Sequence, residues 1–178
     1  MRLELKPHPV AAPLEVRRII VAVGRDGDNL RISFRIPGDP TRLDLPERKD
    51  PRRADGLWER TCFECFIREP GSGPYHEYNF SPSTEWALYR FEAYRSGRTT
   101  ADMPAPLLKV SRRADRFELS ARIAAPPLAT ADWRVGISAI VVERYGNKSY
   151  WALAHPPGDP DFHDPACFAL ELPAARAA

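Results

Sequence analysis

Short segments in which apolar and polar residues alternate dominate the chain. In segment 30–36 every second residue is apolar, and segment 117–123 repeats the pattern. Because successive side chains of a β-strand point to opposite faces, this period predicts strands with one buried face. Seven further segments predict strands: 18–23, 62–68, 76–80, 86–94, 135–144, 149–154 and 168–172.

These segments predict an all-β fold. The sequence GRDGDN at 24–29 predicts a tight turn between two strands. The 19 prolines leave few windows for a long helix, and we expect at most one helical turn, at 126–130. About nine or more strands with turns between them favour an antiparallel β-sandwich of jelly-roll type. At 178 residues the chain suits a single domain, 1–178.

Charge and composition exclude several classes of partner. A net charge of +2 gives no reason to expect a nucleic-acid partner. No segment approaches the roughly 18 apolar residues of a membrane span, and the first residues lack the apolar region of an export signal. Three cysteines, an odd number, fit a reducing compartment. We therefore expect a cytoplasmic protein without a membrane partner.

Cys62 and Cys65 form a CxxC motif, which can indicate a metal or redox site. In an extended strand, residues three apart point to opposite faces, so the two sulfurs should diverge. The chain has no second CxxC to complete a zinc site. We expect neither a metal nor a cofactor here.

A polar face is predicted on the strand at 62–68. If Phe63 and Cys65 face the core, Glu64 points to the opposite face. Extending the same alternation places Trp58 on that face as well.

The next strand adds two polar residues to this face. Tyr78 and Phe80 suit the core, which turns Glu77 and Asn79 to the other side. Two carboxylates and an amide can hydrogen-bond hydroxyl groups while an indole covers the apolar face of a sugar ring. The combination predicts a binding site for a saccharide.

Other interpretations of the same residues remain open. Trp58 could lie in the core or at its rim, with Glu64 paired to an arginine such as Arg60. Glu64 and Glu77 could also be the acid and base of a hydrolase, although we expect no catalysis. Histidines and aspartates of the loop 155–164 could bind a metal, but Asp commonly caps turns and we expect a structural role.

Three runs of sequence resemble a known family. LWERTCFECFI, YHEYNFSP and, after a tryptophan near the end, FHDPACFALEL resemble the DOMON-like superfamily, in its branch related to family-9 carbohydrate-binding modules. The resemblance spans roughly 57–172. It implies a β-sandwich of jelly-roll type that binds a sugar between two tryptophans. Modules of this family are usually appended to secreted enzymes, and we expect this chain to depart from that pattern as a free-standing relative.

Carried over by position, the resemblance gives individual residues a role. Trp58 would be one stacking platform and Trp151 the opposing one. Glu64 would accept hydrogen bonds from hydroxyls, and Asn79 would hydrogen-bond the ligand. Glu77 departs from the family, since sugar-binding members tend to have an arginine there, and this reverses the local charge.

The sequence thus predicts a non-catalytic domain that binds a saccharide or similar polar small molecule. The alternative is a protein-interaction or homodimerisation module that uses the same aromatic face. Less favoured is a haem-binding domain with Met103 and a histidine as ligands, as in other branches of the superfamily.

Overall fold

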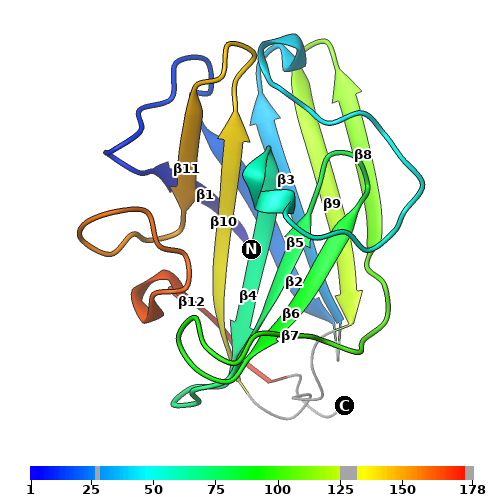
Figure 1. Ribbon diagram of the computed structural model, residues 1–178. Coiled ribbons are helices and arrows are strands. Elements are labelled where there is room, and N and C mark those ends of the chain that lie inside the picture. The colour runs from blue at the N-terminus through cyan, green and yellow to red at the C-terminus, as the bar shows by residue number, and fades with distance from the viewer. Residues whose placement is uncertain (27–28, 125–131, 175–178) are drawn as a thin grey trace.

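The computed structural model describes residues 1–26, 29–124 and 132–174, which form β-strands and three short 3₁₀ helices (Figure 1). The strands are β1 (Arg2–Pro7), β2 (Ile19–Asp26), β3 (Asn29–Pro37), β4 (Cys62–Arg68), β5 (Tyr75–Phe80), β6 (Trp86–Phe91), β7 (Thr99–Thr100), β8 (Leu107–Arg113), β9 (Arg116–Ala124), β10 (Trp133–Val142), β11 (Lys148–Ala152) and β12 (Leu170–Leu172). The 3₁₀ helices are η1 (Pro40–Arg42), η2 (Leu57–Glu59) and η3 (Pro165–Cys167). No helix among these residues is long and apolar enough to cross a membrane.

All nine predicted strands are present, and β1, β7 and β8 are additional. The predicted turn at 24–29 lies between the paired strands β2 and β3, but residues 27–28 are outside the described part. The helical turn expected at 126–130 lies wholly outside the described residues.

The strands form two facing layers of an antiparallel β-sandwich. The first sheet has the order β1-β2-β3-β9-β8, and the second has the order β7-β6-β5-β4-β10-β11, with β12 also paired to β10. β1 belongs to both, because Arg2 to Leu5 pair with β2 while Lys6 and Pro7 pair with β11. In Figure 1 the strands of the second sheet pass in front of those of the first. The predicted sandwich is confirmed, whereas its jelly-roll connectivity stays a prediction.

The main core fills the space between the two sheets. Phe63 of β4 packs against Phe34 of β3 and Phe117 of β9, at ring-centroid distances of 4.9 and 5.6 Å. The inward positions of β4 and β5 belong to the same cluster, including Cys65 and Tyr78. The predicted inward set of these strands is therefore confirmed.

The second sheet also carries an apolar cluster on its outer face. This cluster consists of Phe66, Tyr75, Ala87, Tyr89, Phe91, Ile140, Ala152, Phe162 and Phe168, with Leu57, Trp58 and Tyr150 packed against it. Phe162 and Phe168 come from the segment between β11 and β12, which covers part of the sheet. β4 is consequently buried on both faces, from Cys62 to Ile67.

A glycine lets that covering segment approach the sheet closely. A Cβ atom on Gly136 of β10 would lie 3.2 Å from the carbonyl oxygen of Cys167 in η3 and 3.4 Å from the Cβ of Phe66. The contact with the carbonyl oxygen is tighter than nine in ten real Cβ contacts, so a larger residue here would require its neighbours to shift by a few tenths of an ångström.

Candidate functional site

A cleft of about 380 Å³ opens on the outer face of the second sheet. β4, β5, β6, β10 and β11 supply its floor, while η2, the segment after β6 and the segment before η3 supply its sides. The lining residues are Trp58, Glu64, Glu77, Phe91, Arg95, Arg98, Ile140, Tyr150, Pro160, Phe162 and His163. The cleft thus combines aromatic rings with two carboxyl groups.

Glu64 is a buried carboxyl group at the floor of the cleft, with 3% of its surface exposed. Its Cα partner across β4 and β10 is Ser138, whose hydroxyl donates a hydrogen bond of 2.8 Å to Oε2. Burial, and then the nearby charge of Glu77, raise the pKa of Glu64 to about 8. A carboxyl group of this kind retains its proton near neutral pH and can donate a hydrogen bond as well as accept one.

Glu77 lies beside it on β5 and is also buried, with 5% of its surface exposed. The register pairs Glu64 with Asn79 and Phe66 with Glu77, so the two glutamates are diagonal neighbours on one face. The Asn79 amide donates a hydrogen bond of 2.7 Å to Oε1 of Glu77. Burial raises the pKa of Glu77 as well, although the Asn79 hydrogen bond opposes this.

His163 is the nearest basic side chain to this pair. Its Nε2 lies 3.7 Å from Oε2 of Glu77. Burial, and secondarily the charge of Arg95, lower the pKa of His163 to about 4. His163 is therefore neutral near pH 7 and brings no positive charge to Glu77.

Aromatic rings line the cleft in two groups. Trp58 is half-buried and meets Tyr89 edge-to-face at 6.1 Å between centroids. The guanidinium of Arg98 lies 5.8 Å from the Trp58 ring centroid. The second group is Tyr150 and Phe162, whose ring centroids are 6.4 Å apart.

Hydrogen bonds join the two segments that form the sides of the cleft. Arg95, which follows β6, forms an ion pair of 2.7 Å with Asp161, which precedes η3. The Arg95 backbone N–H donates to the Tyr75 hydroxyl, which shares a hydrogen bond of 2.7 Å with Nδ1 of His163. Both segments are thereby fixed against β5.

The predicted platform Trp151 does not line the cleft. Its ring lies in the main core with 1% of its surface exposed, and its indole N–H donates to Ser149 Oγ. Strand alternation is the reason, because adjacent residues of β11 face opposite sides and Tyr150 takes the cleft side. The prediction that Trp151 opposes Trp58 across a cleft is therefore wrong.

Asn79 is on the predicted face but is fully buried behind Glu77. Its amide donates to Glu77, and its Oδ1 accepts a hydrogen bond of 3.5 Å from the Cys62 thiol. Asn79 therefore orients a carboxyl group instead of lining the cleft, which corrects its predicted contact with the ligand.

Two further predictions concern the direction of the CxxC sulfurs and the partner of Arg60. Cys65 packs in the main core, whereas the Cys62 thiol contacts Asn79 on the other face, so the predicted divergence of the CxxC sulfurs is confirmed. Arg60 pairs with Asp44 at 2.8 Å and not with Glu64. Trp58 reaches the cleft from η2, a 3₁₀ helix, and not by continuing the strand alternation.

The loop 155–164 and the candidate haem ligands lie in several places. His155 Nε2 is hydrogen-bonded to the Lys6 carbonyl, and Asp164 caps η3. Among the described residues no group of three or more side chains is arranged to hold a metal ion.

Met103 and His76 line a separate cavity of about 430 Å³, where the Met103 sulfur accepts a hydrogen bond from Tyr78. Haem binding there remains an untested prediction.

Most residues of the cleft's sides could not be predicted from the sequence. The alternation of segment 149–154 puts Tyr150 and Trp151 on opposite faces, but it does not show which of the two faces the cleft. Arg95, Arg98 and Phe162 lie in segments without periodic patterning, and only the folded chain brings them to the sheet.

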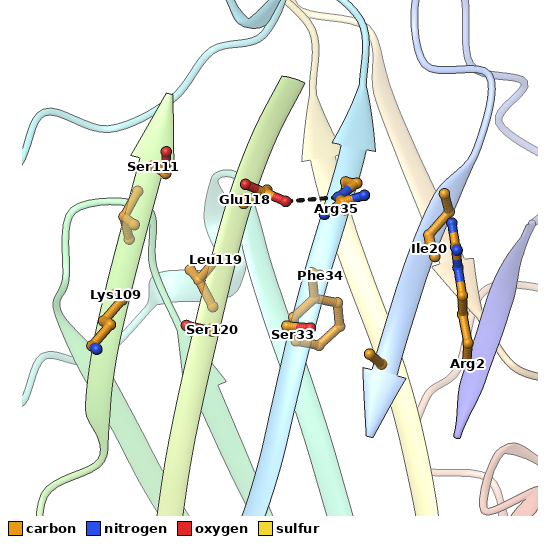
Figure 2. Close-up of a pocket in the computed structure, with 12 residues that line it drawn as sticks. Arg2, Ile20, Ser33, Phe34, Arg35, Lys109, Ser111, Glu118, Leu119 and Ser120 are labelled. Carbon is orange, nitrogen blue, oxygen red and sulfur yellow. Dashed lines mark hydrogen bonds and ion pairs between the residues drawn. The ribbon is translucent and has the colours of Figure 1, made fainter. Parts of the chain in front are cut away.

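A larger hollow, of about 450 Å³, lies on the outer face of the first sheet (Figure 2). Figure 2 shows Arg35 of β3 and Glu118 of β9 joined across it, at 2.7 Å. The one aromatic residue that lines it, Phe34, is fully buried. This surface therefore offers a ligand no exposed ring, and the cleft on the second sheet is the better candidate.

Solved structures of carbohydrate-binding proteins share this fold. A candidate carbohydrate-binding protein from Bacteroides uniformis has a TM-score of 0.57 and 13% identity, over 92% of this chain and 83% of that chain. A family-9 carbohydrate-binding module from Caldicellulosiruptor kristjanssonii in complex with glucose has a TM-score of 0.53 and 15% identity, over 94% of this chain and 81% of that chain. No protein-family model and no curated protein matches the chain. The likeness shows the β-sandwich fold, and membership of the DOMON-like superfamily stays a prediction.

Proposed function

We propose that the cleft on the second sheet binds a saccharide or a similar polyhydroxylated small molecule without converting it. The observation that carries the proposal is the half-buried Trp58 beside two buried carboxyl groups, Glu64 and Glu77, in one concave cleft. The fold's likeness to carbohydrate-binding proteins, one of them in complex with glucose, supports it.

The chemistry of the cleft suits a hydroxylated ring. An indole face covers the C–H groups of a sugar, while carboxyl oxygens accept hydrogen bonds from its hydroxyls. Because the fold favours a proton on Glu64, this carboxyl group can also donate to a hydroxyl oxygen. A carboxyl group that donates as well as accepts can thus match both roles of a hydroxyl group.

Titration calorimetry with a panel of monosaccharides and short oligosaccharides tests the proposal. We expect Trp58→Ala to weaken binding by roughly 1 to 2 kcal/mol, because the ligand loses a stacking surface. Tyr145→Ala is the matched control, since Tyr145 is 84% exposed and outside the cleft. It should bind like the wild type.

Two results would contradict the proposal. The first is the absence of binding to any sugar of the panel, and the second is equal binding by the wild type and Trp58→Ala. Light scattering tests the alternative role, a docking face for a second copy of the chain. We expect the mass of one chain, whereas a dimer that buries Trp58 would close the cleft.

A further inference from the structure

Four glutamates of the described residues are buried, and two of them have a charge partner or a set of backbone donors. Glu85 forms ion pairs with Lys49 at 2.9 Å and with Arg52 at 2.8 Å. Glu143 accepts hydrogen bonds from the backbone N–H groups of Leu14, Glu15 and Val16. Buried carboxylates need such compensation, because removing a charge from water is costly.

Glu64 and Glu77 differ from both. Glu64 has the Ser138 hydroxyl and Glu77 has the Asn79 amide, and these donors are neutral. Among the described residues no lysine or arginine forms an ion pair with either carboxyl group, and the histidine beside Glu77 is neutral near pH 7.

The cations nearest to the pair have other partners. Arg95 forms its ion pair with Asp161, and the Lys148 ammonium donates to the backbone carbonyls of Trp58 and Glu59. The Arg98 guanidinium lies over aromatic rings, 5.0 Å from the Tyr89 centroid. The two buried carboxyl groups therefore face the cleft without an ion pair to a lysine or arginine of the described residues, although Arg95 and Arg98 line the same cleft and partly offset their burial.

The lining of the cleft indicates which kind of cation fits. Aromatic ring faces attract organic ammonium groups and also cover the C–H groups that accompany them. Trp58, Tyr150 and Phe162 offer such rings. A metal ion would need more oxygen ligands than two carboxyl groups supply, and the described residues hold no larger group of ligands here.

We propose that the ligand is an amino sugar, a polyhydroxylated ring with a protonated amine, and that its ammonium group lies between Glu64 and Glu77. This inference rests on the proposed function, since it names the class of saccharide that the same cleft takes.

Binding should also displace a proton. In the empty cleft, burial and mutual repulsion favour a proton on the carboxyl pair, and an ammonium group between them would favour ionisation of both. The charged or titratable groups that act on the pair include Arg95, Arg98, Lys148 and His163. The carboxyl charges also help to raise the pKa of the Cys62 thiol and of the Tyr75 and Tyr89 hydroxyls, which stay protonated near neutral pH. The partners of these groups stay in place, so the proton released comes from the pair.

The experiment compares matched sugars on the intact protein by titration calorimetry. The probes are D-glucosamine, D-galactosamine and D-mannosamine, each beside its neutral parent, D-glucose, D-galactose and D-mannose. We expect at least one amine to bind about tenfold more tightly than its parent, the ratio that corresponds to about 1.4 kcal/mol for a charge-assisted hydrogen bond. Repeating the titration in buffers of different ionisation enthalpy should show proton release for the amine and none for its parent.

Variants assign the effect to the carboxyl pair. The variant Glu64→Gln keeps the side-chain shape and an oxygen that accepts the Ser138 hydrogen bond, but it cannot ionise. The ratio of amine to parent affinity should therefore fall several-fold, with Glu77 left as the one carboxyl group of the pair. Glu4→Gln, an exposed glutamate on β1, should keep the wild-type ratio. Thermal unfolding of both variants checks that they are folded.

Each outcome has a distinct meaning. Equal binding of amines and parents, or tighter binding of the parents, overturns the amino-sugar inference and leaves the proposed function standing. Binding of no sugar at all overturns both. An undiminished preference in Glu64→Gln also overturns the inference, because the carboxyl pair would then not be its source.

Discussion

At the scale of single residues, Glu64 is the carboxyl group at the cleft whose ionisation in the folded protein can be tested by its effect on stability. Burial raises the pKa of Glu64 from 4.5 to about 8, so the folded protein binds more protons than the unfolded chain between these values. The Glu64 contribution to stability should consequently fall as the pH rises through this window.

The expected result is that Glu64→Gln unfolds at higher urea concentration than the wild type at pH 8, with little difference near pH 5. The gain at pH 8 should be on the order of a few kcal/mol, because the amide cannot acquire a buried charge. Urea unfolding of both proteins across this pH range measures it. His163 has the opposite pH dependence, because its lowered pKa makes the fold less stable as the pH falls below 6.5. This effect is present in both proteins and cancels when their free energies of unfolding are subtracted. A pH-independent difference would mean that Glu64 is ionised in the fold without cost.

The sequence predicted the two glutamates of the cleft for a physical reason. The two-residue period of a strand fixes which side chains share a face, and Phe63, Tyr78 and their neighbours identify the core side. Trp151 was assigned from the family resemblance, not from the alternation within its own strand. The apolar neighbours of β11 do not show which of Tyr150 and Trp151 faces inward, and only the packing does.

At the scale of elements, η3 packs closely against β10 at Gly136. This contact positions the segment just before η3, which carries Phe162 and His163. We expect Gly136→Ala to destabilise the protein by about 1–3 kcal/mol, because the new methyl group pushes against the Cys167 carbonyl and Phe66. Sugar affinity should fall as well, since the displaced segment forms one side of the cleft.

Gly24→Ala is the matched control for this substitution. Gly24 also lies in a strand, β2, but a Cβ there meets nothing within 4 Å. Denaturant unfolding and sugar titration of both variants make the comparison. Equal effects of the two substitutions would show that the loss comes from strand glycines in general and not from the contact with η3.

Strands with a regular period and a buried face were predictable, and the others were not. β7 has two residues, Thr99 and Thr100, which is too few for a period. β8 lies at the edge of the first sheet, and its Leu107 is 67% exposed, so its apolar residues do not mark a buried face. β1 does alternate, with Leu3 and Leu5 on one face. The alternating run is too short to be distinguished from a loop by its pattern alone.

At the scale of the whole molecule, the two sheets differ in what covers them. The first sheet has one solvated face, as the alternating burial of β3 and β9 shows. The second sheet is covered on both faces, by the first sheet on one side and by the segments around the cleft on the other. Alternation in the sequence could predict the sandwich but not this second covering, because it depends on loops that have no period of their own.

Because the segments around the cleft leave Trp58 partly exposed, the four tryptophans can report separately on where a ligand binds. Trp86, Trp133 and Trp151 are at most 7% exposed, and Trp58 is the one that lines the cleft. A ligand in the cleft should therefore perturb a single indole, while a partner that binds elsewhere should not perturb it.

The claim that the ligand lies in the cleft is tested most directly by NMR. A sugar found to bind by calorimetry is added in steps to ¹⁵N-labelled protein, and the indole N–H signals of the four tryptophans are recorded. We predict that the Trp58 signal, assigned by its loss in Trp58→Phe, shifts in a saturable manner while the signals of Trp133 and Trp151 stay in place. A shift of the Trp151 signal with an unchanged Trp58 signal would contradict this claim, because the ligand would then lie in a site other than this cleft.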